Sequence, residues 1–387
     1  MAVLLKAQGL TTNFYTYEGI VRALDSFDFS IDHGCTYGLV GESGCGKSVT
    51  VRSMLRVIQA PGKIEGGSVL FSEKPGAEPI DILALSEDEM EEIRGDSISM
   101  IFQEPNAALN PVLTIGDQVV ESFMFHRKRQ MGKLICDEID SGTRSYGLMT
   151  PFYRKMLEVA VERPKSAFLK VCSKIPFIRQ WDSPLKKEAL KRAVDVIGQL
   201  GIANPEEIVT RYPHNLSGGM KQRIVIAIAL ACHPTLLIAD EATSNLDVTV
   251  QAQILQLLNK LKETSISSIL LITHDLGVVA ETCEKVGVMY AGALCETGDV
   301  ASVFSRPLHP YTQALLASVP KFHQEGELQS IEGSVPNLVQ PPSGCRFHPR
   351  CPKAMEVCST EKPELRELIP GHAVACYYAE QQIEGLL

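Results

Sequence analysis

The sequence predicts an α/β fold built around a phosphate-binding loop, and three observations lead to this prediction. The apolar segment CTYGLV runs directly into the glycine-rich segment GESGCGKS. The next segment, SVTVRSMLRVI, places Val51, Leu55 and Ile58 at helical spacing. A second apolar segment, TLLIAD, ends at Asp240 and is followed by Glu241. Because open α/β sheets bind ligands at the carboxyl ends of their strands, we expect both segments to end at one edge of a sheet.

The composition is that of a globular protein with a sizeable core. The chain has 387 residues, of which 45% are hydrophobic and 21% charged, which suits one large domain with an appendage. Its first residues lack the pattern of a secretion signal. The longest apolar run, Ile224 to Cys232, is far shorter than the ~20 residues of a membrane span. We therefore expect any transport role to need separate membrane partners.

The remaining segments are assigned by their periodicity and turn residues. Residues 1–40 and 64–85 are expected to form strands, and Ser86 to Arg94 a helix capped by Ser86. SISMIFQEP is expected to be a strand ending at Gln103, and residues 111–211 to be mostly helical. Further along, the predicted elements are a helix in MKQRIVIAIALA, a helix from Val248 to Leu261, a strand in SSILLITHD and a hairpin in VGVMYAGALCETG.

The glycine-rich segment matches G-x-x-x-x-G-K-[ST] in full, from Gly41 to Ser48. Its backbone N–H groups would face an anion, Lys47 would reach the β- and γ-phosphates, and Ser48 would ligate Mg²⁺. Asp240 suits the Mg²⁺ shell, and Glu241 is positioned to polarise water. A plain glycine turn and a solvated acidic pair are the alternatives for these two segments taken singly.

Two further segments carry polar groups at element ends. LSGGM, from Leu216 to Met220, opens a helix with Ser217 and two glycines, which makes either a second anion site or a simple N-cap. Gln103 and His274 each end an expected strand, where a solvated polar residue is the alternative.

The order of the phosphate loop, Gln103, LSGGM, LLIADE and ITHD resembles that of the ATP-binding-cassette (ABC) proteins. The resemblance implies an ABC-type core with an antiparallel β subdomain and a helical signature subdomain at about residues 104–220. It also implies that two cassettes enclose two ATP molecules. Family members usually have proline after the catalytic glutamate, where this chain has Ala242. The reactive side chains remain, so hydrolysis is still expected.

The resemblance assigns a role to each motif residue. Glu241 would be the general base, His274 would hold the γ-phosphate, and Gln103 would link Mg²⁺ and the water to the membrane subunit. An aromatic residue would stack on adenine, with Phe14 as first choice and Tyr17 as second. The implied ATP contacts are Gly41, Glu42, Ser43, Gly44, Cys45, Gly46, Lys47, Ser48 and Val49; the implied Mg²⁺ ligands are Ser48, Gln103 and Asp240; the partner cassette would be met through Ser217, Gly218, Gly219 and the D-loop residue Asp247.

The end of the chain resembles a narrower branch, the oligopeptide and dipeptide importer ATPases. This likeness lies in FSRPLHPYTQALLASVP and GCRFHPRCPKAMEVC. It implies a cassette over residues 1–322 and a C-terminal extension over residues 323–387. The implied partners are two membrane permease subunits, a second ATPase subunit and an external substrate-binding protein. The chain would then work at the cytoplasmic face of the membrane, importing peptides or, as alternatives within this subunit type, nickel or oligosaccharides.

Eleven cysteines without a secretion signal favour a reducing compartment over disulfides. Four of them, Cys345, Cys351, Cys358 and Cys376, gather in the C-terminal extension. Four thiolates suit an iron–sulfur cluster or structural zinc, and zinc favours tighter cysteine pairs than these. The resemblance favours a [4Fe–4S] cluster, with zinc or four reduced cysteines as alternatives.

Residues 126–192 hold 16 Lys and Arg against 7 Asp and Glu, an excess of +9 in a chain of net charge −9. Relatives have a much shorter segment here, so we assign an insertion to about residues 126–187. A basic surface in this region would attract anionic lipid headgroups. A solvated helical excrescence is the alternative.

The main rival function is an ABC ATPase that acts on nucleic acid, which a basic insertion would suit. Such proteins carry long coiled coils or C-x-x-C pairs between their motifs, and residues 103–217 have neither. No nucleic-acid partner is therefore expected. A cassette without turnover would need a changed residue at Glu241 or His274, and both are present.

Overall fold

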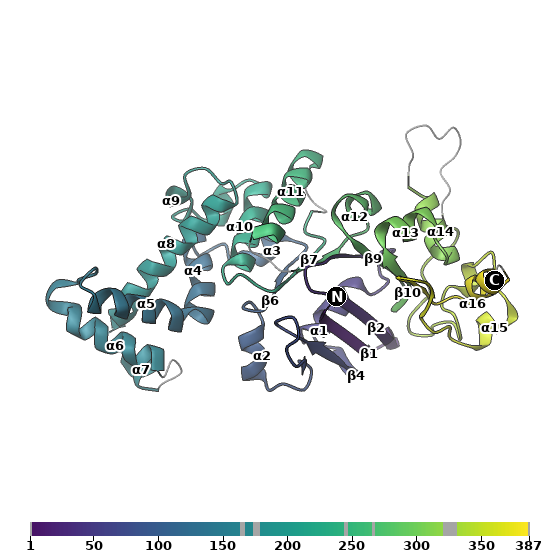
Figure 1. Ribbon diagram of the computed structural model, residues 1–387, viewed down its shortest axis with the longest axis horizontal. Helices are drawn as coiled ribbons and strands as arrows, with labels where there is room; N and C mark the ends of the chain where they lie inside the picture. Colours follow the sequence, from purple (N-terminus) through teal and green to yellow (C-terminus); the bar gives the residue numbers. More distant parts are fainter. Residues whose placement is uncertain are drawn as a thin grey trace. The chain divides into compact units, whose positions relative to one another are not determined.

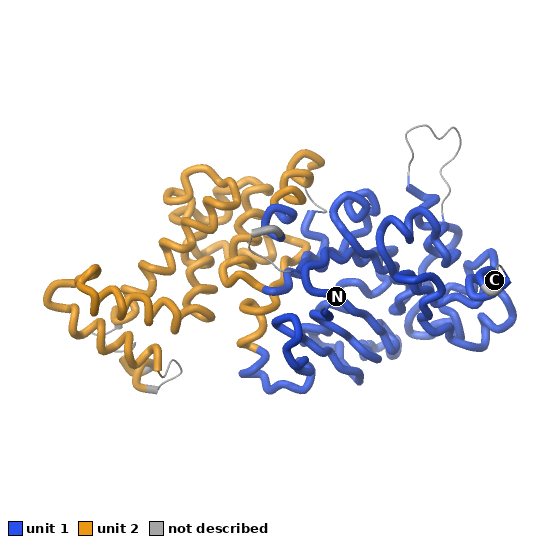
Figure 2. The backbone as a smooth tube through the Cα atoms, in the orientation of Figure 1, with its two compact units in different colours: residues 1–90, 235–244, 258–387 blue, residues 91–234, 245–257 orange. Residues whose placement is uncertain are grey.

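The computed structural model describes residues 2–162, 167–172, 179–243, 247–264, 268–319 and 331–385. The chain forms two compact units, shown in Figure 2. Unit 1 comprises residues 1–90, 235–244 and 258–387, and unit 2 comprises residues 91–234 and 245–257. The predicted boundary at residues 322 and 323 lies outside the described residues.

Unit 1 contains an antiparallel sheet from the start of the chain (Figure 1). Its strands lie in the order β2-β1-β4-β5, and their bounds are β1 Val3–Thr16, β2 Gly19–Asp32, β4 Gly62–Phe71 and β5 Ile80–Asp81. β1 lies between β2 and β4, and residues along β1, β2 and β4 alternate between buried and exposed positions. This alternation is what a sheet with one solvated face requires, and it confirms the predicted strands.

A second sheet in unit 1 carries the phosphate loop. From one side its order is β11-β12-β10-β9-β3-β8-β7, with bounds β3 Thr36–Val40, β7 Leu236–Asp240, β8 Ser268–Ile272, β9 Lys285–Tyr290, β10 Ala293–Asp299, β11 Arg366–Ile369 and β12 His372–Val374. β9, β3, β8 and β7 are parallel, whereas β10, β12 and β11 follow as antiparallel neighbours. Every residue of β3, β7 and β8 is buried, which explains their continuous apolar runs.

The register of the parallel strands decides where the functional segments end. Leu39 of β3 and Asp240 of β7 both align with Ile272, the last residue of β8. The chain therefore leaves these three strands at one edge of the sheet. This alignment confirms the expectation that the glycine-rich segment and the acidic pair share an edge.

The helices of unit 1 are mostly short. They are α1 Lys47–Met54, α12 Leu276–Thr282, α13 Val300–Ser305, α14 Pro310–Ala317, α15 Glu356–Thr360 and α16 Tyr377–Glu384, with a 3-10 turn η4 at His348–Arg350. The prediction that α1 extends to Ile58 was wrong. The helix stops at Met54, because Arg56 adopts a left-handed backbone (φ 54°) that a helix cannot continue through.

Unit 2 is mainly helical, as predicted for residues 111–211, and also holds strand β6 Ile98–Ile101. Its helices are α3 Pro105–Ala108, α4 Ile115–His126, α5 Lys128–Asp140, α6 Thr150–Glu162, α7 Ala167–Cys172, α8 Ser183–Gln199, α9 Pro205–Ile208 and α10 Gly218–Leu230, with 3-10 turns η1 Gly147–Met149, η2 Arg179–Asp182 and η3 Pro213–Asn215. Two further helices, α2 Glu87–Ile93 and α11 Val248–Thr264, have residues in both units.

The expected helix cap at Ser86 is present. The Ser86 hydroxyl and backbone N–H both bond the Glu89 carboxylate, and the Glu89 N–H donates back to the hydroxyl. The pair therefore satisfies backbone donors at the start of α2.

Candidate active site

The phosphate loop, Gly41 to Ser48, joins β3 to α1 in unit 1. Gly41, Gly44 and Gly46 have φ values of 152°, 80° and 105°. A Cβ on Gly41 would lie 2.2 Å from the carbonyl oxygen of Met289, so a side chain cannot fit there. The glycines thus leave the backbone free to turn its N–H groups toward an anion at the start of α1.

Lys47 is buried within the loop rather than extended into solvent. Its ammonium group donates hydrogen bonds to the carbonyl oxygens of Gly41, at 2.7 Å, and Glu42, at 3.1 Å. The positive charge is therefore held over the loop, where the phosphates of a nucleotide would bind.

Ser48 and Asp240 form the second part of the site. The Ser48 hydroxyl donates to Asp240 Oδ1 at 2.8 Å, and Asp240 is only 1% exposed. Within the described part of the chain, its other oxygen, Oδ2, is buried and has no hydrogen-bond partner. Burial raises the pKa of the Asp240 carboxyl, chiefly through desolvation. A hydroxyl beside a buried carboxylate with an unpaired oxygen fits Mg²⁺, which prefers hard oxygen ligands.

Glu241 follows β7 in a strained conformation that the sequence did not reveal. Its φ is +48°, and its backbone N–H donates to the carbonyl oxygen of Ile272 at 3.0 Å. The turn brings the Glu241 carboxylate to 3.4 Å from Nδ1 of His274. Strained residues of this kind cluster at functional sites. The next residue, Ala242, which stands where family members usually have proline, is buried.

Unit 2 presents the LSGGM segment at the start of α10. Ser217 is the N-cap and accepts a hydrogen bond from the N–H of Met220 at 3.4 Å. Ser217 and Gly218 are exposed, which leaves the helix terminus accessible. A Cβ on Gly219 would lie 2.9 Å from a methyl group of Val250, so this glycine allows close packing at the start of α11.

Two other predicted site residues also belong to unit 2. The Asp247 carboxylate accepts from the N–H of Val250 at 2.9 Å, which places it beside the same packing contact. Its D-loop neighbours Asn245 and Leu246 lie outside the described residues. Gln103 is exposed and lies between β6 and α3.

Two protein-family models match this chain. A family model described as ABC transporter matches residues 24–244, which is more than half of the chain. The chain belongs to the ABC transporter family. A second model, described as the oligopeptide/dipeptide transporter C-terminal region, matches residues 295–358.

Relatives extend this similarity over the full ABC chain. The oligopeptide transport ATP-binding protein AppD of Bacillus subtilis is 41% identical over 99% of this chain and 98% of its own length. The dipeptide transport ATP-binding protein DppD of the same organism is 39% identical, over 99% and 97%. The oligopeptide transport ATP-binding protein OppD of Escherichia coli is 39% identical, over 98% and 94%.

Among solved structures, the ATP-binding cassette MJ0796 bound to ADP and Pi has the same fold. Its TM-score is 0.54 with 24% identity, and the match covers 77% of this chain and 99% of that cassette. An ABC cassette fold is thereby confirmed for this chain.

The adenine-stacking residue of this ABC chain stays a prediction. Phe14 lies near the end of β1, partly buried, and packs against Gly62 of β4. Tyr17 is 97% exposed at the turn between β1 and β2. Tyr15, which the sequence did not single out, lies between them, and its hydroxyl donates to Glu65 at 2.7 Å.

The four cysteines of the predicted C-terminal extension, Cys345, Cys351, Cys358 and Cys376, line one small cavity, together with His348. The backbones of Cys345 and Cys358 are joined by an N–H to O bond of 2.8 Å. Burial raises the pKa of Cys345 to about 11 and that of Cys376 to about 12. Among the described residues, however, no group of three or more His, Cys, Asp or Glu side chains stands ready to hold a metal ion. The structure thus gathers the cysteines around one cavity, and the iron–sulfur cluster and zinc stay predictions.

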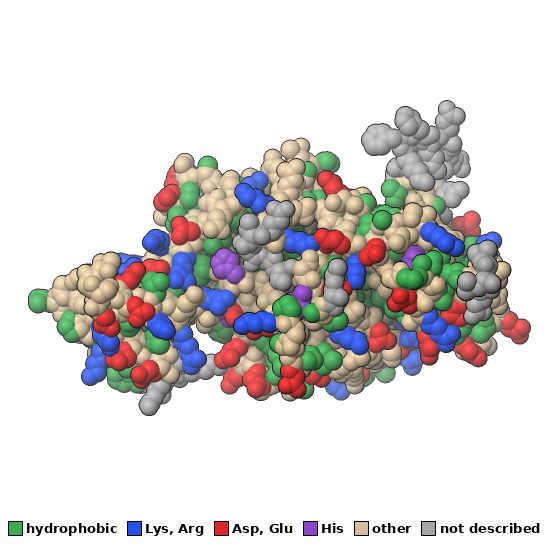
Figure 3. All heavy atoms as spheres, in the orientation of Figure 1, with side chains coloured by type: hydrophobic (Ala, Val, Ile, Leu, Met, Phe, Trp, Pro, Cys, Tyr) green, Lys and Arg blue, Asp and Glu red, His purple; other side chains and the backbone are tan. Residues whose placement is uncertain are grey.

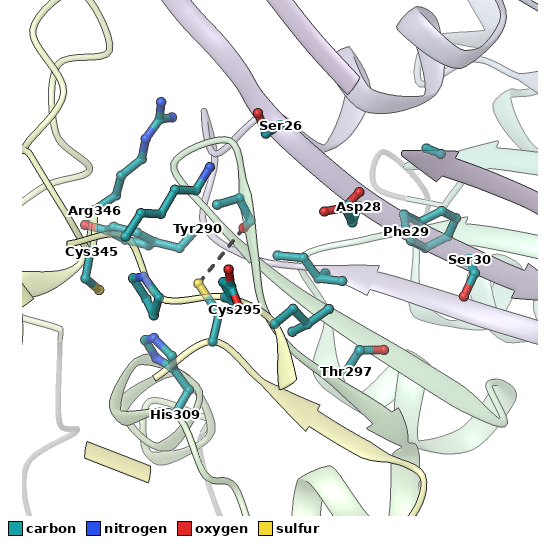
Figure 4. A pocket seen from close by; sticks show the side chains of 18 of the residues that line it. Ser26, Asp28, Phe29, Ser30, Tyr290, Cys295, Thr297, His309, Cys345 and Arg346 are labelled. Atoms are coloured by element: carbon teal, nitrogen blue, oxygen red, sulfur yellow. Dashed lines mark hydrogen bonds between the residues drawn. The ribbon is translucent and has the colours of Figure 1, made fainter. Parts of the chain in front are cut away.

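A second cavity, of about 670 Å³, lies beside this region and away from the phosphate loop. Figure 4 shows Cys345, Arg346 and His309 on one side of it, with Asp28 and Ser30 of β2 on the other. Residues 345–347 and the antiparallel sheet therefore line one cavity within unit 1.

Many charges of the predicted insertion, residues 126–187, are paired with neighbouring side chains, and blue and red side chains are mixed over this region (Figure 3). Arg144 pairs with Glu138 and Glu188, each at 3.0 Å, and Arg154 pairs with Asp140 and Glu158. Trp181 is buried, with Lys128 4.8 Å above its ring. These pairs reduce the free positive charge that the insertion offers to a partner.

Two other observations bear on membranes. The side chains of Leu148 and Phe168 are exposed within the insertion. Across the described ranges, none of the helices combines the length and the apolar character that crossing a bilayer would need.

Proposed function

We propose that this chain is the ATP-hydrolysing subunit of an ABC importer for peptides. The observation that carries the proposal is the pairing of Ser48 with Asp240 beside the buried Lys47 and the strained Glu241. The similarity of the whole chain to proteins named for oligopeptide and dipeptide transport supports the cargo class.

In the proposed mechanism, the phosphate loop and Lys47 bind the triphosphate of ATP. Ser48, Asp240 and Gln103 would hold Mg²⁺, which would supply positive charge to neutralise the phosphates. Glu241 takes a proton from the attacking water, and His274 holds the γ-phosphate. Asp247, Ser217, Gly218 and Gly219 face the nucleotide bound by a second cassette, as in the family's ATP sandwich.

The partners in this proposal are two membrane permease subunits, a second ATPase subunit and an external substrate-binding protein. The chain would lie at the cytoplasmic face of the membrane. Its C-terminal extension would comprise residues 323–387. Import of nickel or oligosaccharides is the alternative within the same subunit type, and action on nucleic acid is a more distant one.

The test is isolation of the chain with the proteins that accompany it in its own cell, followed by transport in vesicles. We expect two permease-type membrane proteins to co-purify and MgATP to drive uptake of labelled di- and oligopeptides. The proposal fails if the chain purifies free of membrane proteins and its ATPase activity responds to DNA or RNA. Uptake of nickel or an oligosaccharide in place of peptides would correct the cargo alone.

We further propose that Cys345, Cys351, Cys358 and Cys376 bind a [4Fe–4S] cluster, with zinc as the alternative. The support is their position around a single cavity and the affinity of thiolates for both. Protein purified without oxygen should be brown and contain iron and acid-labile sulfide, and Cys351→Ser should remove the colour. Colourless protein with one zinc per chain would select zinc, and metal-free protein would defeat the site.

A further inference from the structure

One arginine of the predicted C-terminal extension contacts the phosphate loop. Arg350, in η4, pairs with Glu42, the second residue of the loop. Its Nη1 lies 2.8 Å from Oε2 of Glu42, and its Nη2 lies 3.2 Å from Oε1. The guanidinium therefore grips both oxygens of the carboxylate, the arrangement that gives an ion pair directional strength. The Arg350 side chain is only 7% exposed, so solvent screens the pair weakly.

The remaining donors of Arg350 fix it within the C-terminal extension and β9. Nε donates to the carbonyl oxygen of Glu332 at 2.8 Å, and Nη2 also donates to those of Ile331 and Gly333. Nη1 donates to the hydroxyl of Tyr290 at 3.1 Å. These hydrogen bonds fix the position of the guanidinium, so Arg350 can restrain the phosphate loop.

Glu42 is held from a second side by the same region. Its backbone N–H donates to the hydroxyl of Tyr311 at 2.9 Å. The Tyr311 ring packs on Tyr290 and Phe347, with centroids 4.7 and 5.3 Å apart. These three buried aromatic residues come from α14, β9 and the C-terminal extension, and Cys345 and Cys351 pack against the same cluster. The loop, the cluster and the cysteine cavity are thus in continuous contact.

We propose that Arg350 is a positioning residue for ATP binding, and that it makes nucleotide affinity depend on the docked C-terminal extension. The inference rests on the proposed ATPase function. The physical reason is charge: without Arg350, the carboxylate of Glu42 would stand unneutralised beside the loop that must accept a triphosphate. It would repel the nucleotide and loosen the first turn of the loop.

The test measures the Kd of MgATP for purified variants of the full chain. Arg350→Ala should raise the Kd about fivefold to tenfold, within the usual range of coupling between sites. The Kd of Arg350→Lys should lie between those of wild type and Arg350→Ala, because lysine keeps the charge but cannot make the bidentate contact. The turnover rate at saturating ATP should change much less than the Kd. Arg366→Ala is the matched control, since Arg366 lies in the same extension and pairs with the exposed Glu364.

The decisive variant is the double substitution of Arg350→Ala with Glu42→Gln. Because glutamine removes the unneutralised charge, the double variant should bind MgATP more tightly than Arg350→Ala alone. If Arg350 had a purely structural role, the double variant would bind MgATP no more tightly than Arg350→Ala, and that result would overturn the proposal. So would equal affinities for wild type, Arg350→Ala and Arg366→Ala. If a thermal unfolding experiment shows that Arg350→Ala is not folded, the same comparison is made between Arg350→Lys and the double variant Arg350→Lys with Glu42→Gln. Failure of the wild type to bind MgATP would instead defeat the proposed function.

Discussion

At the carboxyl edge of the sheet, Glu241 has a left-handed backbone of the kind that clusters at functional sites. Glu241 sits at φ +48°, in a region that costs a non-glycine residue of order 1 kcal/mol or more. Its N–H is bonded to Ile272 and its carboxylate lies beside His274. The backbone is therefore fixed so that the carboxylate points out of a buried strand toward the proposed reaction site.

Glu241→Gln should bind MgATP with the same affinity as wild type. Its turnover rate should fall about 100-fold or more, which is the lower end of the range for loss of a general base. The amide keeps the shape of the side chain but cannot accept the proton. Steady-state hydrolysis and equilibrium binding measure the two effects separately. Lys47→Ala is the contrast, because it should weaken binding itself. Near-normal turnover in Glu241→Gln would remove the role given to this residue.

Gly41→Ala should lower the free energy of unfolding by more than about 1 kcal/mol, since alanine is strained at this φ. The added Cβ would also meet the Met289 carbonyl oxygen at 2.2 Å. Gly44→Ala is the matched control, because nothing lies within 4 Å of a Cβ there although its φ is also positive. Denaturant unfolding should place Gly44→Ala between wild type and Gly41→Ala. Equal stabilities of the two variants would show that the contact with Met289 is not decisive.

At the scale of elements, the predicted basic insertion ends within α8, a helix of unit 2. Leu185, Ala189 and Ala193 are buried on α8, and its Glu188 binds Arg144 and Arg192. The predicted end of the insertion, residue 187, lies inside this helix. A deletion should therefore stop before Ser183. It should also keep Arg127, which pairs with Asp96 at 2.8 Å.

Replacing residues 129–181 by a short Gly-Ser linker should leave MgATP affinity unchanged, because every proposed phosphate contact lies outside this range. If the insertion meets anionic lipid, the variant should also bind vesicles containing phosphatidylserine less tightly than wild type. The difference should shrink as salt rises and the Debye length falls from ~10 Å at 0.1 M to ~3 Å at 1 M. Titration of both proteins against anionic vesicles and duplex DNA compares the two ligands. Equal vesicle binding by both would defeat the lipid hypothesis, and a difference confined to DNA would favour the nucleic-acid function.

For the whole molecule, buried titratable groups tie the C-terminal residues to the rest of unit 1. Glu296 of β10 is fully buried and accepts from the backbone N–H groups of Leu308 and His309, at 2.7 and 2.9 Å. It also binds His372 of β12 at 2.7 Å. Its carboxylate thus joins two strands of the sheet to the start of α14. His309 caps α14 through Nδ1, which accepts from the N–H of Tyr311.

Stability should fall as the pH drops below 6.5. Burial lowers the pKa of His309 from 6.5 to about 4, against the opposing charge of Glu296. Between these values the unfolded chain binds a proton that the folded chain does not, so the free energy of unfolding decreases as pH falls. The loss from this group between pH 7 and pH 4 is about 3 kcal/mol.

The measurement compares wild type with His309→Asn, since asparagine can still cap a helix but does not titrate. Denaturant unfolding at several pH values should give the variant a shallower decline than wild type over this window. His214→Asn, at an exposed position, should leave the decline unchanged. Parallel curves for wild type and His309→Asn would contradict the assignment.

The sequence by itself determined the cassette fold and the order of its parts. GESGCGKS, LSGGM and LLIADE each need particular residues at fixed spacing, because backbone turns and phosphate contacts are local. The buried parallel strands were equally visible as continuous apolar runs. The capping pair of Ser86 and Glu89 was predictable for the same reason, since its partners lie three residues apart.

Only the tertiary structure decided which distant residues meet. Contacts across long stretches of chain decide four features: the end of α1, the left-handed Glu241, the bidentate ion pair of Arg350 with Glu42 and the gathering of four cysteines. Glu42 and Arg350 are 308 residues apart, so no local pattern relates them. An ion pair of this kind needs only one acid and one base, and the sequence has 46 and 37 to choose from. The fold selects this pair by burying the guanidinium of Arg350 within reach of the Glu42 carboxylate.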